Sequence, residues 1–292
     1  MVTHRATARC YDSPPMDRPI GLIAGQGGLP LLCARGIRAA GRRVACVGLA
    51  DQADPTLPQL CDVYATAGII RIGRWIRLLR RWGVEEAIMV GRVRKARMYE
   101  PFRLVRQMPD WRAAKLWFRV LRNDRRNEAL LRAVANELAA GGIRLIDSTK
   151  YIPEHLAEEG VMTRTQPTAK QWADIQFALP IVRAMNELDV GQAIAVTEGE
   201  VLAVEAIEGT DKMIARAGEL CRVGNWTLVK TAKAKQDMRF DVPTVGLRTI
   251  ENLKQAGGRC LALEVGRVIM LDKPEFLAAA DRAGIAVVGV KL

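Results

Sequence analysis

The stretch that decides the fold of the first half of this chain reads Pro19-Ile-Gly-Leu-Ile-Ala-Gly-Gln-Gly-Gly-Leu-Pro30. Residues 19–24 form a short apolar run that predicts a buried strand, and the glycines of residues 25–28 predict a tight loop. A helical pattern then continues to Ala40, with Gly41 as its stop signal. A strand, a glycine loop and a helix in this order are typical of a parallel α/β sheet.

The following residues repeat this alternation. Three apolar runs predict further strands, at residues 44–49, 87–90 and 144–146. Two helical patterns predict helices between them, at residues 72–82 and 127–140. Such alternation implies a parallel sheet covered by helices on both faces. We therefore predict the α/β class, with a flexible leader at residues 1–18 and a Rossmann-like, parallel-sheet N-terminal domain at residues 19–150.

The glycine loop points to a ligand crevice but not to a dinucleotide. Ligands of such sheets bind beyond the carboxyl ends of the strands, so the loop 25–28 and the turn 91–95 are expected to face one crevice. The loop lacks the third glycine of a dinucleotide fingerprint, and no acidic ribose ligand follows the second strand. Backbone N–H groups at the helix start would still suit a phosphate, whereas a tight turn alone explains two of the three glycines.

The second half has a different organisation. Proline, glutamate and threonine outnumber long aliphatic residues at 151–170, where we predict a linker. Thr168 is a suitable N-cap for a helix to about Glu187, a hairpin is expected around Glu198-Gly-Glu200, and another helix begins at Gly209 or Thr210. Helices and strands then alternate to the end. Residues 171–292 are thus predicted as a mixed α/β C-terminal domain that carries catalysis.

Composition excludes several classes of protein. The chain has 292 residues and 49% hydrophobic content, as expected for a soluble two-domain protein. It shows no signal-peptide pattern and no uncharged run near the roughly 18 residues of a membrane helix, so we expect a cytoplasmic protein. Six cysteines without a CxxC pair suggest neither a zinc site nor disulfides. Because the only histidines are His4 and His155, carboxylates, lysines or a metal must carry any catalysis.

The net charge of +12 is concentrated between Arg71 and Arg126, where 17 Lys and Arg residues stand against 5 Asp and Glu. Aromatic residues interleave with these cations, a mixture that suits an anionic membrane surface or single-stranded nucleic acid. The alternative is a solvated helix face opposite a core stripe, since Trp75, Leu79 and Trp82 recur at helical spacing. No helix-turn-helix, zinc-finger or RNP motif occurs, so nucleic acid is not an expected partner.

Charged residues crowd into an otherwise apolar segment between Glu198 and Gly246. They include Glu205, Glu208, Asp211, Lys230, Lys233, Lys235, Asp237, Arg239 and Asp241. Carboxylates hold divalent metal ions and cations neutralise phosphate oxygens, which is what hydrolysis of a phosphate ester or pyrophosphate requires. We therefore predict a site for a phosphorylated substrate in this segment.

Four motifs, in order along the chain, carry a family resemblance. They are residues 21–30, Asp189-Val-Gly-Gln192, Val204-Glu-Ala-Ile-Glu-Gly-Thr-Asp211 and the segment from Lys230 through Gly246. Together they resemble the LpxI family of UDP-2,3-diacylglucosamine pyrophosphatases, from about residue 18 to the C-terminus. The resemblance implies a Rossmann-like domain followed by a distinctive second domain, with the ligand between them.

The resemblance also implies a reaction. Members of the family hydrolyse the pyrophosphate of UDP-2,3-diacylglucosamine with Mg²⁺, water attacking the α-phosphorus, to give UMP and 2,3-diacylglucosamine 1-phosphate (lipid X) in lipid A biosynthesis. A UDP-linked diacylated glucosamine substrate, Mg²⁺ or another divalent metal, and a homodimer are therefore expected. Together with the basic aromatic segment, the acyl chains of the substrate would place the protein on anionic lipid, peripheral at the inner face of the cytoplasmic membrane.

Residue roles follow from the same resemblance. The family segment K-x-x-Q-x-x-R-x-D-x-P makes Asp241 the catalytic carboxylate, either as a metal ligand or as the group that orients the attacking water. The implied metal ligands are Asp241 and Asp211. The implied substrate contacts are Gly28, Gly91 and Val93 on the nucleotide side, and Arg183, Gln192, Thr210, Asp211, Lys230, Lys233, Gln236 and Arg239.

The chain departs from the family pattern at three points. Ala234 stands in place of a proline, Arg126-Asn-Glu-Ala-Leu-Leu131 replaces Gly-Asp-Asp-Ala-Leu-Leu, and Arg92 replaces an asparagine between Gly91 and Val93. Two alternatives to the family reaction stay open. One is a non-catalytic nucleotide- or lipid-binding protein, and the other is a pyrophosphatase of a soluble nucleotide sugar.

Each acidic candidate also has a purely structural interpretation. Asp241 before Val242-Pro243 suits a turn, and the run from Glu208 to Asp211 suits a helix N-terminus, where acids are favoured. Glu205 would be buried only if it met Lys230 or a metal, because an unpaired buried carboxylate is costly. We otherwise expect Glu205 to face solvent.

Overall fold

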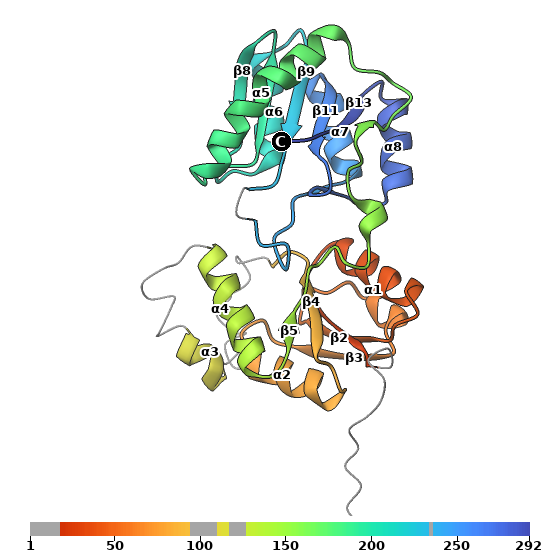
Figure 1. Cartoon of the computed structure of the whole chain (residues 1–292), viewed down its shortest axis with the longest axis vertical. Helices are drawn as coiled ribbons and strands as arrows, with labels where there is room; N and C mark the ends of the chain where they lie inside the picture. The colour runs from red at the N-terminus through yellow and green to blue at the C-terminus, as the bar shows by residue number, and fades with distance from the viewer. Residues whose placement is uncertain (1–17, 94–109, 117–126, 234–235) are drawn as a thin grey trace, which may run out of the picture. The chain divides into compact units, whose positions relative to one another are not determined.

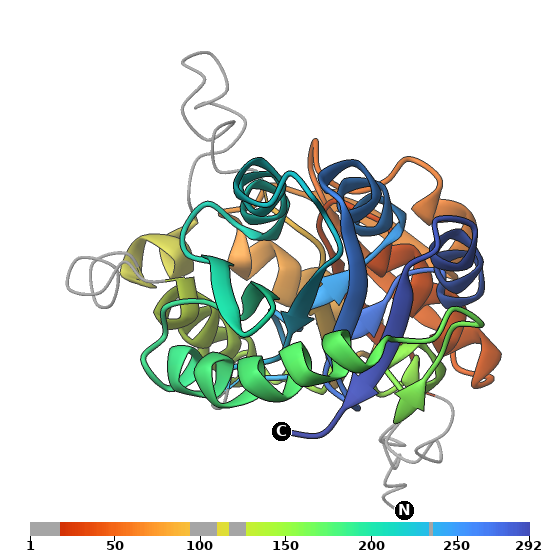
Figure 2. The ribbon, with the colours of Figure 1, turned by 90° about the horizontal axis from the view of Figure 1, so that it is seen from above.

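The computed structural model describes residues 18–93, 110–116, 127–233 and 236–292 (Figures 1 and 2). The chain divides into two compact units, Met1–Ile146 and Asp147–Leu292. The predicted leader lies outside the described residues apart from Arg18, whose side chain pairs with Glu85.

The first unit is built on a five-stranded, all-parallel sheet, which confirms the prediction. The strands are β1 (Ile20–Ala24), β2 (Val44–Leu49), β3 (Val63–Ala67), β4 (Glu86–Val90) and β5 (Arg144–Leu145), in the order β3-β2-β1-β4-β5. The helices are α1 (Leu29–Ala39), α2 (Ile72–Arg81), α3 (Trp111–Leu116) and α4 (Asn127–Ala140), with a 3-10 turn η1 (Leu57–Leu60). β1 and β2 are buried along their whole length, as expected of inner parallel strands.

The strand order changes direction between β1 and β4. The chain moves outward from β1 to β3 and then returns to the other side of β1, which makes this edge a topological switch point. The loops that follow β1 and β4 contact each other there, and the ligand crevice that they are expected to face stays a prediction. Gln26 and Arg92 form a backbone bridge with N···O distances of 2.8 and 2.9 Å, and the N–H of Gly25 donates to the Val90 carbonyl at 2.8 Å.

Two glycines make this meeting possible. A Cβ on Gly25 would lie 2.7 Å from the carbonyl oxygen of Arg92, and a Cβ on Gly91 would lie 2.7 Å from the carbonyl carbon of Gly25. Gly91 also has a φ of +98°, a conformation that glycine adopts without steric cost. Gly25 and Gly91 are therefore required by close backbone contact.

Helix α2 tests the interpretation of the arginine-rich segment. Its buried residues are Ile72, Trp75, Ile76 and Leu79, and its exposed arginines are Arg74, Arg77, Arg80 and Arg81. The core stripe opposite a solvated basic face is thus confirmed for this helix. The other parts of the segment, at residues 94–109 and 117–126, lie outside the described residues.

The second unit contains a six-stranded mixed sheet, again as predicted. Its order is β6-β13-β11-β9-β7-β8. β9 (Trp226–Lys230), β11 (Gly258–Glu264) and β13 (Ala286–Val290) are parallel, whereas β6 (Gly160–Val161), β7 (Ala193–Thr197) and β8 (Glu200–Val204) join by antiparallel pairing. Two short strands, β10 (Thr244–Val245) and β12 (Ile269–Met270), pair with each other separately.

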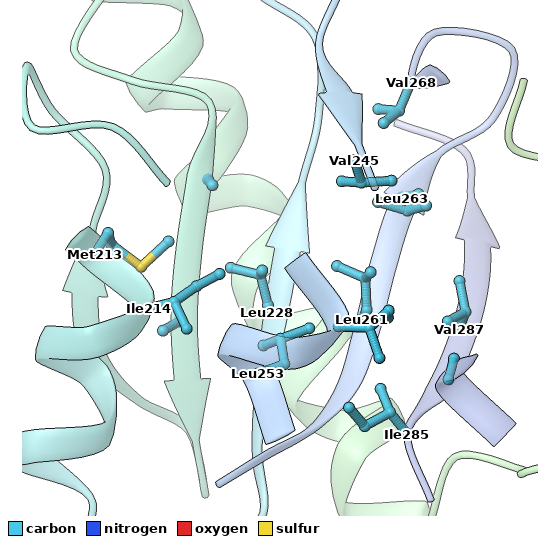
Figure 3. Packing of buried hydrophobic residues seen from close by; sticks show 14 of the residues in the cluster. Met213, Ile214, Leu228, Val245, Leu253, Leu261, Leu263, Val268, Ile285 and Val287 are labelled. Atoms are coloured by element: carbon cyan, nitrogen blue, oxygen red, sulfur yellow. The ribbon is translucent and has the colours of Figure 1, made fainter. Parts of the chain in front are cut away.

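Helices pack on both faces of this sheet. α5 (Ala169–Glu187) packs on one face, and α6 (Thr210–Leu220), α7 (Leu247–Ala256) and α8 (Lys273–Arg282) pack on the other. The side chains of successive strand residues point to opposite faces of the sheet. Leu228 packs with Ile214 and Leu253 (Figure 3), whereas Val229 packs with the apolar residues of α5, so β9 is buried throughout.

The segment predicted as a linker, residues 151–170, contains the 3-10 turn η5 (Pro153–His155) and β6. β6 pairs with β13, and the division between the two units falls after Ile146. Thr168 caps α5 as predicted. Its hydroxyl accepts from the backbone N–H of Gln171 at 3.2 Å, and the Gln171 side chain accepts from the Thr168 N–H at 2.9 Å.

Gly25→Ala is expected to destabilise the chain by about 1–3 kcal/mol, because the added methyl group overpacks the contact with the Arg92 carbonyl. Denaturant unfolding measures the effect. Gly28→Ala is the matched control, since a Cβ there meets no atom within 4 Å. Equal unfolding free energies for the two variants would contradict the requirement for close backbone contact.

Candidate active site at the carboxyl edge of the second sheet

A buried lysine lies at the carboxyl end of the central strand β9. Lys230 is the last residue of that strand and is 5% exposed. Its Nζ donates to Oγ1 of Thr210 at 2.8 Å, and the same hydroxyl donates to Oε1 of Glu205 at 2.9 Å. Glu205 is 7% exposed, so the expectation that it faces solvent is wrong. The condition for its burial is met through Thr210, which links it to Lys230.

Strand pairing brings these three side chains to one edge. β7 runs antiparallel to β9 and places Ala193 beside Lys230, and the N–H of Glu205 donates to the Ala193 carbonyl at 2.8 Å. Thr210 is the first residue of α6 and follows Gly209, which has a φ of +82°. The end of β9, the start of β7 and the residue after β8 therefore converge.

The motif Asp189-Val-Gly-Gln192 closes the same edge. A Cβ on Gly191 would lie 1.9 Å from the carbonyl oxygen of Glu205, so glycine is required there. The carbonyl of Gln192 accepts from the N–H of Thr231 at 2.9 Å. The motif thus holds the backbone on both sides of the buried cluster, while a substrate contact by the Gln192 side chain stays a prediction.

Three side chains from other elements clamp the chain as it leaves β9. The Asn186 side chain of α5 donates to the Ala232 carbonyl at 3.0 Å, and Glu264 at the end of β11 accepts from the Ala232 N–H at 2.7 Å. Arg267 bridges Glu264 at 3.2 Å and the Lys233 carbonyl at 3.0 Å. Residues 231–233 consequently have a defined course toward the predicted catalytic segment.

The predicted catalytic segment is internally connected. The Lys233 side chain pairs with Asp189. The backbone N–H of Lys233 donates to the side-chain oxygen of Gln236 at 3.2 Å. The Gln236 side-chain amide in turn donates to the backbone carbonyl of Asp241. Asp241 is exposed and has a φ of +71°, which aspartate tolerates better than most residues. The structure therefore links Lys233, Gln236 and Asp241, three members of the family motif.

Arg239 has a partner within the same segment. Its guanidinium forms two hydrogen bonds with Asp237, at 2.9 and 2.6 Å. The hydrogen bond with Asp237 raises the pKa of Arg239 further above its ordinary value. Arg239 also lies 5.5 Å from the ring centre of Phe240. A substrate contact by Arg239 stays a prediction and would have to share the guanidinium with Asp237.

Asp211 is directed toward α7. Its carboxylate pairs with Arg248 and accepts from the Asn252 side chain at 3.0 Å. Thr210 and Asp211 are thus consecutive residues with different partners. Among the described residues, no three His, Cys, Asp or Glu side chains gather closely enough to hold a metal ion. Mg²⁺ bound to a phosphorylated ligand commonly takes only one or two protein carboxylates, so this finding leaves Asp241 and Asp211 as predicted ligands.

The remaining candidates lie elsewhere on the two units. Gly28 is the exposed N-cap residue of α1, and Gly91 and Val93 are exposed after β4 in the same unit. Open space surrounds Gly28, which suits backbone N–H contact with an anion at the start of α1. Arg183 is exposed on α5. Their substrate contacts stay predictions.

The thiols of the described residues differ in burial and in pKa: Cys33, Cys46 and Cys260 are buried, whereas Cys61 is partly exposed and a hydrogen bond with the Cys46 side chain lowers its pKa. Cys33, Cys46, Cys61, Cys221 and Cys260 are free thiols, and Cys10 lies outside the described residues. Burial raises the pKa of Cys33 to about 12, and burial likewise raises that of Cys260 to about 12. Both thiols therefore stay protonated at neutral pH and pack as small apolar side chains.

Sequence reasoning missed Asn186, Glu264 and Arg267 as parts of this edge. A signal existed for Glu264, because an acidic residue ends an otherwise apolar strand just as Lys230 does. Asn186 lies near the end of a helix in an ordinary amphipathic pattern, and nothing local distinguishes it. Its role depends on the packing of α5 against β9.

Comparisons with known proteins match both units. The model of the LpxI N-terminal domain matches residues 19–155, and that of the LpxI C-terminal domain matches residues 158–288. The UDP-2,3-diacylglucosamine pyrophosphatase LpxI of Caulobacter vibrioides is 35% identical over 283 residues, which cover 94% of this chain and 98% of that protein.

Two solved structures show weaker similarity. A biotin carboxylase complex from Campylobacter jejuni is 14% identical, with 72% of this chain and 44% of that chain covered and a TM-score of 0.26. A nucleoside-diphosphate-sugar epimerase from Pseudomonas aeruginosa is 15% identical, with 93% and 88% covered and a TM-score of 0.28. Neither similarity is strong enough to support an argument about fold or function.

Glu264→Ala is expected to destabilise the protein by about 1–3 kcal/mol or more, because it leaves the buried N–H of Ala232 without its acceptor and removes the partner of Arg267. Thermal and denaturant unfolding measure the loss. Glu219→Ala, at an exposed position of α6, is the control. Unchanged stability of the Glu264 variant would show that residues 231–233 are held by other contacts.

Proposed function

The chain belongs to the LpxI family, and on this premise we propose that it is a UDP-2,3-diacylglucosamine pyrophosphatase of lipid A biosynthesis. The products would be UMP and 2,3-diacylglucosamine 1-phosphate, or lipid X. The observation that carries the proposal is the match over nearly the whole length of a relative with this activity in its name.

The chemistry at the edge of the second sheet supports a pyrophosphate substrate. Lys230 carries its ammonium beside the first turn of α6, where the helix N-terminus adds positive partial charge. Lys233 adds a second cation on the chain that leaves β9. Positive charge fixed in advance at the position of a reacting phosphate stabilises the developing charge of a transition state. In our proposal the ammonium groups of Lys230 and Lys233, and the backbone N–H of Thr210 at the start of α6, bind phosphate oxygens.

Asp241 is the proposed catalytic carboxylate. Its backbone is held by Gln236, and its exposed side chain would orient the attacking water toward the α-phosphorus. A divalent cation, Mg²⁺ in our proposal, would neutralise phosphate oxygens when bound. Asp241 would be its first protein ligand. Asp211 would serve as a second only by exchanging its contact with Arg248 or Asn252.

Asp241→Asn is expected to lower kcat by roughly 100-fold or more, because the amide keeps the shape of the side chain but removes its charge. The test incubates purified protein with UDP-2,3-diacylglucosamine and Mg²⁺ in ¹⁸O-enriched water and measures UMP and lipid X. Asparagine also tolerates the positive φ of residue 241, so this variant separates chemistry from folding better than Asp241→Ala. Asp272→Asn, at an exposed aspartate that also has a positive φ (+48°), is the matched control.

The outcomes separate the alternatives. Label in the UMP and loss of turnover on chelation of the metal agree with the proposal. Tight substrate binding without turnover by the wild type would favour a nucleotide- or lipid-binding protein. Equal turnover of a UDP-sugar without acyl chains would favour a pyrophosphatase of a soluble nucleotide sugar. Undiminished turnover by Asp241→Asn would move the catalytic carboxylate to another residue.

We further propose a cytoplasmic protein that is peripheral at the inner face of the cytoplasmic membrane. None of the helices in the described ranges is long and apolar enough to cross a bilayer. The exposed arginines of α2 offer positive charge to anionic lipid. Each basic residue near such a membrane surface contributes about 1 kcal/mol to the free energy of binding. A homodimer, and the absence of a nucleic-acid partner, stay predictions.

Sedimentation with vesicles that contain anionic lipid is expected to recover the protein at low ionic strength and to lose it as salt rises, because screening weakens surface attraction. Replacement of Arg77 and Arg80 by glutamine should lower the bound fraction. Replacement of Arg222 and Lys254, two exposed cations of the second unit, removes equal charge and is the control. No binding to anionic vesicles at low salt would exclude the membrane role.

A further inference from the structure

Glu205, Thr210 and Lys230 form a buried chain of two hydrogen bonds. The carboxylate accepts from the Thr210 hydroxyl at 2.9 Å, and this hydroxyl accepts from the Lys230 ammonium at 2.8 Å. Glu205 and Lys230 are both more than nine-tenths buried. A single hydroxyl group therefore connects two opposite charges at the end of the central strand.

The direction of the hydroxyl depends on Glu205. Threonine has one hydroxyl proton, and donation of that proton to Glu205 turns a lone pair of Oγ1 toward Lys230. If the carboxylate were absent, the hydroxyl would be free to rotate and would no longer fix the position of Nζ. Glu205 thus acts on Lys230 through the Thr210 hydroxyl.

The second oxygen of Glu205 argues against a purely structural role. Oε2 is buried and has no hydrogen-bond partner among the described residues. A buried polar atom without a partner costs free energy and is uncommon in folded proteins. Apolar residues of similar volume in place of a buried charge pair are often neutral or stabilising. Stability alone therefore gives little reason for the pair of Glu205 and Lys230 at this position.

The backbone around Glu205 is also held rigidly. Gly191 packs against the carbonyl oxygen of Glu205. The backbone N–H of Glu205 donates to the Ala193 carbonyl at 2.8 Å. Asp211 ties the first turn of α6 to Arg248 and Asn252 of α7. Since both the strand end and the helix start are fixed, the chain of hydrogen bonds has one defined geometry.

We propose that Glu205 is a positioning residue, which acts through Thr210 to hold the ammonium of Lys230 at a phosphate oxygen of the substrate. The proposal rests on the proposed function for the identity of the substrate. It adds Glu205 to the acidic residues Asp241 and Asp211 of the proposed site, with a role in binding geometry and no contact with the reacting atoms.

The test compares Glu205→Ala, Glu205→Gln, Thr210→Val and the double variant Glu205→Ala/Thr210→Val. Glu200→Gln, at an exposed glutamate that begins β8, the strand that precedes Glu205, is the control. Two measurements are made on each folded variant: kcat and KM with UDP-2,3-diacylglucosamine, and the Kd of inorganic pyrophosphate by calorimetry. Thermal unfolding confirms that each variant is folded.

Glu205→Ala is expected to lower kcat/KM and pyrophosphate affinity by roughly 10- to 100-fold, because misplacement of a binding group by about 1 Å has effects of this size. Glu205→Gln should recover most of that loss, since the amide oxygen still accepts from Thr210. The double variant should lose no more pyrophosphate affinity and kcat/KM than the more strongly affected single variant, because both changes act on Lys230 through Thr210.

Three results would overturn the proposal. They are equal affinity and kcat/KM for Glu205→Ala and Glu200→Gln, multiplication of the two single losses in the double variant, and no binding of pyrophosphate by the wild type. If Glu205→Ala does not fold, the test rests on the other two single variants. Pyrophosphate affinity close to that of the wild type in Glu205→Gln, together with a lower affinity in Thr210→Val, would then support the proposal, and equal affinities would overturn it. Failure of the proposed function looks different: the wild type would bind pyrophosphate in a Glu205-dependent way but would not hydrolyse UDP-2,3-diacylglucosamine.

Discussion

The burial of a charged ammonium at the end of an apolar strand is the constraint on which the second unit depends. Lys230 ends β9 between two hydrophobic cores, and an unpaired charge there would cost several kcal/mol. The sheet meets this cost by antiparallel pairing of β7 and β8, which brings Glu205 to the same edge, and by the start of α6, which supplies Thr210. Strand order, helix start and side-chain chemistry are therefore coupled at one place.

Close backbone approach at glycine is the second recurring device. In the first unit Gly25 and Gly91 allow the loops after β1 and β4 to touch at the switch point of the sheet. In the second unit Gly191 allows the chain before β7 to touch the carbonyl of Glu205. In both places the absence of a Cβ lets two chain segments meet beside a predicted ligand position. Substitution there would alter the site and the fold together.

Adjacent residues of one motif have separate tasks in this structure. Thr210 turns inward to the buried charges, whereas Asp211 turns to α7 and joins two helices. Lys233 pairs with Asp189, and Gln236 holds the backbone of Asp241. The polar residues between Glu198 and Gly246 are thus divided between stabilising the edge of the sheet and presenting groups to a substrate. Their common location reflects both requirements.

Sequence alone determined the elements whose signals are local. The apolar run of β1, the cap of α5 at Thr168, the hairpin at Glu198-Gly-Glu200 and the parallel sheet of the first unit follow from periodicity, capping and glycine placement. Tertiary structure decided the rest. β3 is partly exposed, and the two residues of β10 have too short a pattern to predict a strand. The burial of Glu205 also depended on partners 5 and 25 residues away, because a carboxylate enters a protein interior only where the folded chain brings it a donor and an opposite charge.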